Sequence, residues 1–112
     1  MTNIGLIEPG MSFTDMTRIA HRLPEEYRAL RYGVVAHGVG LCDEYPCVRY
    51  PEDVAAHGYG GSFEPGMTLC VEAYVGAVGG REGIKLEEQV LVTETGAVPL
   101  SQYRYEDDLL GM

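Results

Sequence analysis

The sequence predicts a small α+β domain built on an antiparallel sheet. Its first segment, up to about Arg31, has apolar side chains at helical spacing, and two later runs alternate apolar with polar residues on either side of a Gly-Gly pair. The chain has 112 residues, 46% of them hydrophobic, which suffices for one hydrophobic core. We therefore expect helices followed by a hairpin sheet within one domain.

Two helices are expected before the sheet. Ser12 follows the turn Glu8-Pro9-Gly10 and forms a capping-box pattern with Asp15. The apolar residues that follow at helical spacing are Phe13, Met16, Ile19, Ala20 and Leu23. Pro24 should end this helix and begin a second, short one that reaches Leu30.

The middle of the chain begins with a strand and then loses its periodicity. The run from Gly33 to His37 is typical of a buried strand. From Gly38 to Gly61 the glycines and prolines are frequent and no period persists. We expect a long, irregular but ordered loop there, which forms one wall of a cleft.

The last part of the chain predicts a hairpin. Residues 69–75 and 84–92 each alternate apolar and polar side chains, and Gly79-Gly80 between them is suited to a tight turn. Centring the hairpin on that pair places Glu72 opposite Glu87. Thr93 to Gly96 predicts a further turn, and the acidic end of the chain (Glu106, Asp107, Asp108) is expected to be solvated.

Charge and composition exclude several classes of partner. Seventeen acidic against eight basic residues give a net charge of -9, which repels phosphate backbones and anionic lipids. No apolar run approaches the roughly 20 residues that span a bilayer, and Met1 to Glu8 lack the features of a secretory signal. We expect a cytoplasmic protein with no nucleic acid or membrane partner. Its three cysteines (Cys42, Cys47, Cys70) lack zinc-ribbon spacing and should be free thiols.

The carboxylate pair indicates a cation site. Glu72 and Glu87, as cross-strand neighbours, would have Cβ atoms roughly 4.5 to 5.5 Å apart, and two like charges so placed need neutralisation. A register slipped by one residue, or a solvated pair, is the alternative. His37 ends the preceding strand, and Gly38 and Gly40 after it allow close approach of backbone. One imidazole with two carboxylates suits iron, manganese, cobalt or zinc.

These residues occur in motifs that resemble the creatinase/prolidase family of metallohydrolases, whose fold is called pita-bread. The matching segments are His37-Gly38-Val39-Gly40-Leu41, Glu64-Pro65-Gly66-Met67, Glu72, and Leu86 to Glu94. The resemblance implies the C-terminal half of that fold, a curved antiparallel sheet with helices on its convex face. It also implies a dinuclear metal site, with His37, Glu72 and Glu87 among its ligands.

The resemblance further implies that residues 1–112 are only part of a catalytic domain. The aspartate ligands of the family come from earlier strands that have no counterpart in this sequence. Three ligands hold a single ion weakly and do not clamp two. We therefore expect a fragment that is inactive by itself.

Within the family, the sequence is similar to the DddP-type branch, which cleaves dimethylsulfoniopropionate (DMSP) into dimethyl sulfide and acrylate. Peptidases of the family carry a second histidine seven residues after the ligating one, where this chain has Glu44. The lyase branch instead uses an aspartate six residues after that histidine, and Asp43 stands there. Tyr32 matches a tyrosine that contacts substrate. Beta-elimination needs a base beside an activated carboxylate, and Asp43 is the expected base.

The expected function is therefore that of a metal-dependent DMSP lyase, a carbon-sulfur lyase that acts on a small sulfonium carboxylate. The alternatives are a proline-specific aminopeptidase or prolidase, and a truncated chain without catalysis. The resemblance suggests iron, with zinc, manganese or cobalt as other options, and a homodimer for the full-length protein.

Overall fold

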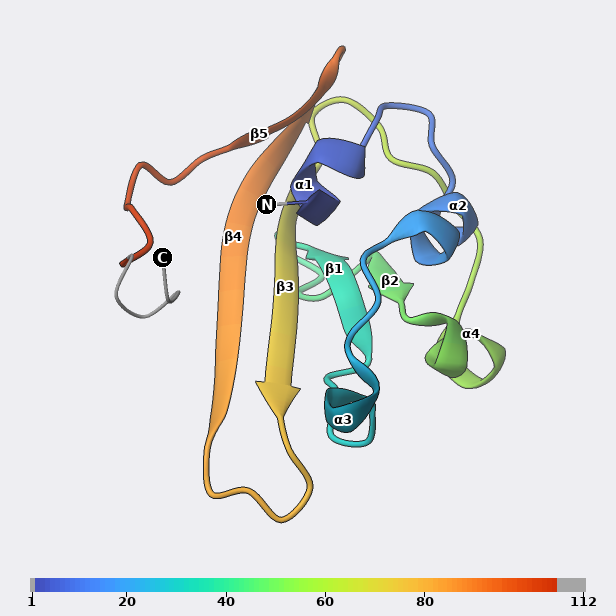
Figure 1. The fold of residues 1–112 in the computed structure, drawn as a ribbon. Coiled ribbons are helices and arrows are strands. Elements are labelled where there is room, and N and C mark those ends of the chain that lie inside the picture. The colour runs from blue at the N-terminus through green and yellow to red at the C-terminus, as the bar shows by residue number, and fades with distance from the viewer. Residues whose placement is uncertain (1, 107–112) are drawn as a thin grey trace.

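The computed structural model describes residues 2–106. In chain order the elements are α1 (Thr2–Leu6), α2 (Phe13–Ile19), α3 (Glu25–Arg28), β1 (Val34–Gly38), β2 (Cys47–Arg49), α4 (Pro51–His57), β3 (Thr68–Gly76), β4 (Gly83–Thr93) and β5 (Gly96–Pro99). The strands form one antiparallel sheet in the order β2-β1-β3-β4-β5. This α+β arrangement confirms the predicted fold class (Figure 1).

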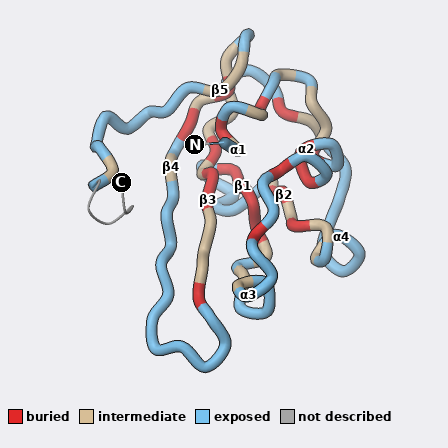
Figure 2. Tube along the Cα trace, viewed as in Figure 1, coloured by how far each residue is buried: buried red, intermediate tan, exposed pale blue. Residues whose placement is uncertain are grey.

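The helices before the sheet supply one side of the hydrophobic core. Ile4 of α1 and Phe13 and Met16 of α2 are buried together with Val71 of β3 and Val90 of β4. Buried residues lie along β1, β2 and α2 and at the ends of β3 and β4 near α1, while the far half of β4 and the hairpin tip are exposed (Figure 2). Because side chains alternate along a strand, Cys70 and Glu72 point away from the face that carries Val71. That second face carries the candidate site.

The helix capped by Ser12 is shorter than the sequence predicts. The cap is confirmed, since Ser12 Oγ accepts a hydrogen bond from the Asp15 backbone N–H at 3.0 Å. The helix ends at Ile19 rather than at Pro24, because Ala20 is extended and the His21 N–H donates to the Asn3 side chain at 2.8 Å. Ala20 and Leu23 are nevertheless buried, as expected of residues on the apolar face.

The prediction of one irregular loop from Gly38 to Gly61 is wrong. The segment contains strand β2 and helix α4, and Pro51 occupies the first turn of that helix, where its missing N–H costs nothing. Strand β2 has only three residues, too few to show a periodicity. Helix α4 has no buried residue and therefore no apolar stripe in the sequence.

The hairpin register is confirmed, whereas the tight turn is not. Glu72 pairs with Glu87, but the strands end at Gly76 and Gly83, so residues 77–82 form a longer connection. Strand β1 pairs with β3 only up to Val71, and β5 pairs with β4 only from Val90 onward. The hairpin therefore continues beyond the sheet as a two-stranded ribbon, with Glu72 and Glu87 at its root.

The remaining predictions concern the ends of the chain and its surroundings. The turn from Thr93 to Gly96 joins β4 to β5 as predicted. Glu106 is exposed, and Asp107 and Asp108 lie outside the described residues. No helix among residues 2–106 has both the length and the apolar character needed to cross a membrane.

Candidate metal centre

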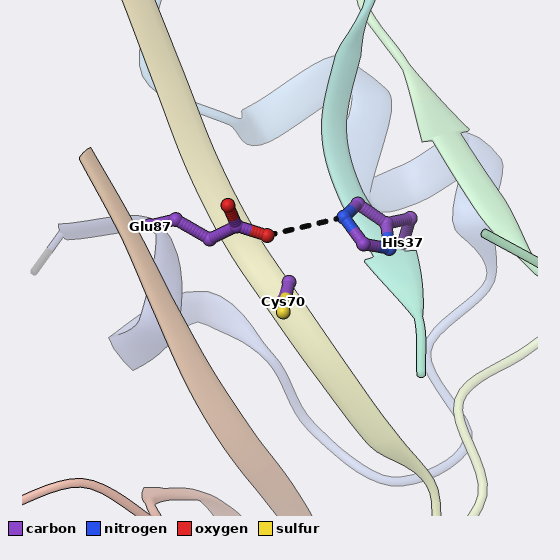
Figure 3. A group of neighbouring side chains, drawn as sticks. All are labelled: His37, Cys70 and Glu87. Atoms are coloured by element: carbon purple, nitrogen blue, oxygen red, sulfur yellow. Dashed lines mark ion pairs between the residues drawn. The ribbon is translucent and has the colours of Figure 1, made fainter. Parts of the chain in front are cut away.

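The sheet register brings the three predicted ligands to one face of three adjacent strands. His37 of β1 lies opposite Cys70 of β3, and two residues further along β3, Glu72 lies opposite Glu87 of β4. His37 Nε2 is 3.3 Å from Glu87 Oε1 and 3.7 Å from Glu72 Oε1. Figure 3 shows the imidazole and the Glu87 carboxylate pointing toward each other across β3. The predicted convergence of the three groups is therefore present.

The imidazole is oriented as in a metal ligand. Its Nδ1 lies 2.9 Å from the Gly38 carbonyl oxygen, which can only accept, so Nδ1 carries a proton in this contact. A histidine that binds a metal commonly donates its other ring N–H to a carbonyl in this way. Nε2 then faces Glu72 and Glu87, and in the neutral ring its lone pair points at two acceptor groups.

Glu72 is the most buried charged group of the site. Its side chain is 1% exposed, and among residues 2–106 no group donates a hydrogen bond to either carboxylate oxygen. Lys85 Nζ approaches Oε2 to 2.6 Å and forms an ion pair with it. A buried carboxylate without hydrogen bonds is costly unless a cation neutralises it.

Lys85, the only lysine in the sequence, is a part of the site that sequence reasoning missed as a functional group. Its ammonium lies between the two carboxylates, 2.6 Å from Glu72 Oε2 and 3.5 Å from Glu87 Oε2. It also lies 4.9 Å from the centre of the Tyr32 ring. The sequence spacing does place Lys85 beside the site, because residues 85 and 87 are two apart on β4 and point to the same face.

Charge and burial shift the pKa values of the site groups in opposite directions. Burial opposes ionisation of Glu87, but the Cys70 thiol and the Lys85 charge outweigh it and lower the pKa of that carboxyl. Burial, together with the Glu87 carboxylate, raises the pKa of the Cys70 thiol to about 12. The cluster therefore stabilises a negative Glu87 beside a protonated thiol.

The predicted substrate residue, Tyr32, lies beside this cluster, because Lys85 Nζ is 4.9 Å from the centre of its ring. The Tyr32 hydroxyl lies 3.0 Å from both oxygens of Glu44, so its position is tied to the loop that contains Asp43. Burial and this acceptor raise the pKa of Tyr32. Asp43 is exposed, with φ at 50°, a backbone conformation that aspartate tolerates better than most residues. Within residues 2–106 its carboxylate forms no hydrogen bond or ion pair, so no contact joins it to His37, Glu72 or Glu87.

The residues present fit a divalent metal ion. His37, Cys70 and Glu87 each offer a ligand atom, and these atoms lie within 4.8 Å of one another. Glu72 adds a buried carboxylate without hydrogen bonds beside the same imidazole. One nitrogen, carboxylate oxygens and one sulfur form a donor set suited to first-row transition metals and zinc.

A model of metallopeptidase family M24 matches residues 1–94, which include His37, Glu72 and Glu87. The chain belongs to metallopeptidase family M24. Members of this family are metal-dependent enzymes.

Two curated relatives carry the name dimethylsulfoniopropionate lyase DddP. The M24 chain described here is 50% identical over 111 residues to the one from Roseovarius nubinhibens and 43% identical to the one from Roseobacter denitrificans. A Xaa-Pro dipeptidase from Pyrococcus furiosus is 33% identical over 103 residues. The alignments cover 99%, 99% and 88% of this chain. The chain spans about a quarter of the length of these relatives, 25%, 25% and 27% respectively.

Solved M24-type structures share the fold. A prolidase from Pyrococcus furiosus superposes with a TM-score of 0.67 and 25% identity, covering 92% of this chain and 29% of the other. An X-Pro aminopeptidase from Thermotoga maritima has a TM-score of 0.70 and 19% identity, covering 93% and 28%. These neighbours confirm the predicted pita-bread architecture.

Proposed function

We propose that this chain supplies the histidine and glutamate ligands and the catalytic base of a DMSP lyase, with the remaining ligands contributed by other parts of the full enzyme. The convergence of His37, Glu72 and Glu87 on one point is the observation that carries this proposal. The identity of 50% to a protein named as such a lyase supports the choice of reaction. Residues 1–112 would then be part of a catalytic domain, inactive alone.

The proposed reaction removes a proton and breaks a carbon-sulfur bond. The Asp43 carboxylate takes a proton from the carbon next to the substrate carboxylate. The electron pair of that C–H bond forms the C=C bond of acrylate, and the C–S pair leaves with neutral dimethyl sulfide. A bound divalent ion supplies Lewis-acid stabilisation of negative charge on the substrate carboxylate. His37, Glu72 and Glu87 would hold that ion.

Tyr32 is proposed to bind the sulfonium end of the substrate. The Lys85 ammonium already lies 4.9 Å from the centre of its ring, so a cation fits over that face. The phenol is held by Glu44, next in sequence to the proposed base. This chain of contacts would set the substrate carbon near Asp43, which must approach it to about 3 Å.

Peptide hydrolysis is the second candidate, favoured by the match to a Xaa-Pro dipeptidase at 33% identity. The position seven residues after His37 argues against it, because Glu44 stands there and its carboxylate is engaged by Tyr32. We propose iron as the resident metal and a homodimer as the state of the full enzyme, both from the lyase resemblance. A cytoplasmic location is part of the same proposal.

The test compares dimethyl sulfide release with hydrolysis of Xaa-Pro dipeptides by a polypeptide extended upstream to include the remaining ligands. We expect this polypeptide to release dimethyl sulfide from DMSP and not to hydrolyse Xaa-Pro dipeptides. Asp43→Asn should lower kcat by about a hundredfold or more, the range of general base catalysis, at unchanged metal content. Glu72→Gln should lose metal as well, and Glu94→Gln, in the exposed turn, is the control. Dipeptide cleavage without dimethyl sulfide would overturn the lyase proposal.

A further inference from the structure

Cys70 occupies a position in the cluster to which the predicted ligand set assigns no role. It lies opposite His37 in the β1–β3 pairing and two residues before Glu72 on the same face of β3. In Figure 3 its side chain stands between the imidazole of His37 and the carboxylate of Glu87. The Cys70 Sγ, one ring nitrogen of His37 and one oxygen of Glu87 lie within 4.8 Å of one another.

A second observation indicates that a cation belongs at this point. The Glu72 side chain is 1% exposed, its oxygens accept no hydrogen bond from the part of the chain that the structure describes, and Oε1 lies 3.7 Å from His37 Nε2. The ammonium of Lys85 approaches only the other oxygen, Oε2. Within the described residues Lys85 therefore pairs with Glu72 through Oε2, while Oε1 faces the imidazole of His37 without a hydrogen-bond donor.

The other two cysteines do not share this environment. Cys42 is exposed in the loop after β1. Cys47 is buried, and its thiol donates to the Glu44 carbonyl oxygen at 2.6 Å, so it is already used in fixing the start of β2. Cys70 is thus the one thiol of the three that faces the imidazole and the carboxylate of the site.

We infer that Cys70 Sγ is a further donor to the metal ion held by His37 and Glu87. The inference rests on the metal centre of the proposed function and adds a ligand to it. A cysteine ligates as the thiolate, so binding breaks the S–H bond, forms an S–metal bond and passes the proton to solvent. Sulfur is a soft donor, and the centre should therefore favour zinc, cobalt or cadmium over manganese or magnesium.

The test is a titration of the 112-residue chain with Cd²⁺ and with Co²⁺, followed by absorption and by equilibrium dialysis. We expect a thiolate-to-metal charge-transfer band in the near ultraviolet. Cys70→Ser should abolish the band and weaken Cd²⁺ binding by at least about tenfold. Removing a group that only contacts a metal ligand already causes a loss of that size, so removing a ligand should cost no less. The affinity of the Cys70→Ser variant for Mn²⁺ should change far less than its affinity for Cd²⁺. Cys42→Ser, the same substitution at an exposed thiol, should behave as the wild type.

Two further variants keep the outcome decisive. The double variant C42S/C47S leaves Cys70 as the only thiol, so the band must persist in it, whether or not Cys70→Ser folds. Cd²⁺ binding that gives no charge-transfer band, and that the His37→Ala variant loses, would overturn the role of Cys70. The metal centre itself would still be supported by that result. A chain that binds neither ion, even with the weak affinity expected of three ligands, would overturn both. None of these measurements depends on dimethyl sulfide release, so a failure of the lyase reaction is recognised separately.

Discussion

Lys85 Nζ lies 2.6 Å from the Oε2 atom of Glu72, so an ammonium group reaches a carboxylate that is otherwise sealed from solvent. The cross-strand carboxylate pair needs positive charge, and in this structure part of it comes from a side chain two residues before Glu87 on the same strand. A metal ion would meet the same two carboxylates. The Lys85 ammonium and a bound metal ion would therefore neutralise the same two carboxylates, those of Glu72 and Glu87.

Lys85→Met should destabilise the metal-free chain and increase its response to metal. Removing the ammonium leaves Glu72 buried without a counter-charge, which costs about 1 to 3 kcal/mol after allowance for the exposure of the lysine head. Urea unfolding in the presence of a chelator measures this loss. Added Zn²⁺ or Co²⁺ should raise the stability of the variant more than that of the wild type.

The matched control for this prediction is Arg81→Met, which removes an exposed positive charge from the connection between β3 and β4. It should change the stability by less than about 0.5 kcal/mol, as is usual for a surface position. An equal loss in the two variants would mean that net charge, and not the carboxylate pair, sets the effect.

Gly38→Ala should disrupt the end of β1, whereas Gly40→Ala should not. A Cβ atom at position 38 would collide with the carbonyl oxygen of Tyr45, while one at position 40 would have no atom within 4 Å. The first substitution should cost about 1 to 3 kcal/mol or more, as overpacking does, and should displace the neighbouring His37. Chemical denaturation of the pair measures the difference, and equal stabilities would contradict this account of Gly38.

Arg31→Gln should destabilise the chain more than Arg18→Gln. Arg31 binds Asp53 with two nitrogens, at 2.8 and 2.9 Å, and the side chains are 21% and 22% exposed. The contact ties the segment after α3 to the first turn of α4. We expect a loss of about 1 to 2 kcal/mol, typical of a charge-assisted hydrogen-bonded pair.

Arg18 provides the comparison, because it pairs with Asp15 at 3.1 Å but the two side chains are 70% and 51% exposed. Exposed pairs contribute about 0 to 1 kcal/mol. A larger loss at Arg18 than at Arg31 in thermal unfolding would show that α4 is held by other contacts.

Cys42 should react with thiol reagents well before Cys47 and Cys70. It is exposed, whereas burial raises the pKa of both other thiols, so less thiolate is present in them at pH 8. Alkylation followed by mass spectrometry should give one fast modification, which Cys42→Ser removes. A fast second modification in that variant would indicate that β2 or β3 opens readily.

The hairpin register could be predicted because it depends on local rules. Alternation along β3 and β4, with a glycine pair between them, sufficed to place Glu72 opposite Glu87, as the structure confirms. The position of His37 next to them needed the long-range pairing of β1 with β3, which the family motifs supplied and periodicity could not.

The missed features depend on contacts between distant segments. Strand β2 exists because β1 offers it an edge, and the end of α2 depends on the bond from His21 to Asn3, 18 residues away in sequence. The proximity of Glu44 to Tyr32 likewise follows from the path of the loop after β1. Contacts between distant segments leave no periodic pattern of residues, so they could not be predicted from the sequence.

The ribbon beyond the sheet has a consequence for amide hydrogen exchange. Among residues 2–106, each strand has one strand neighbour from Glu72 to Gly76 and from Gly83 to Glu87, so one side of each backbone has no strand beside it. Protection factors should be high near Leu69 and Val90 and should decline toward the tip. A ligand that joins Glu72 to Glu87 would close the base of the ribbon, and its arrival would be recorded as slower exchange along both strands.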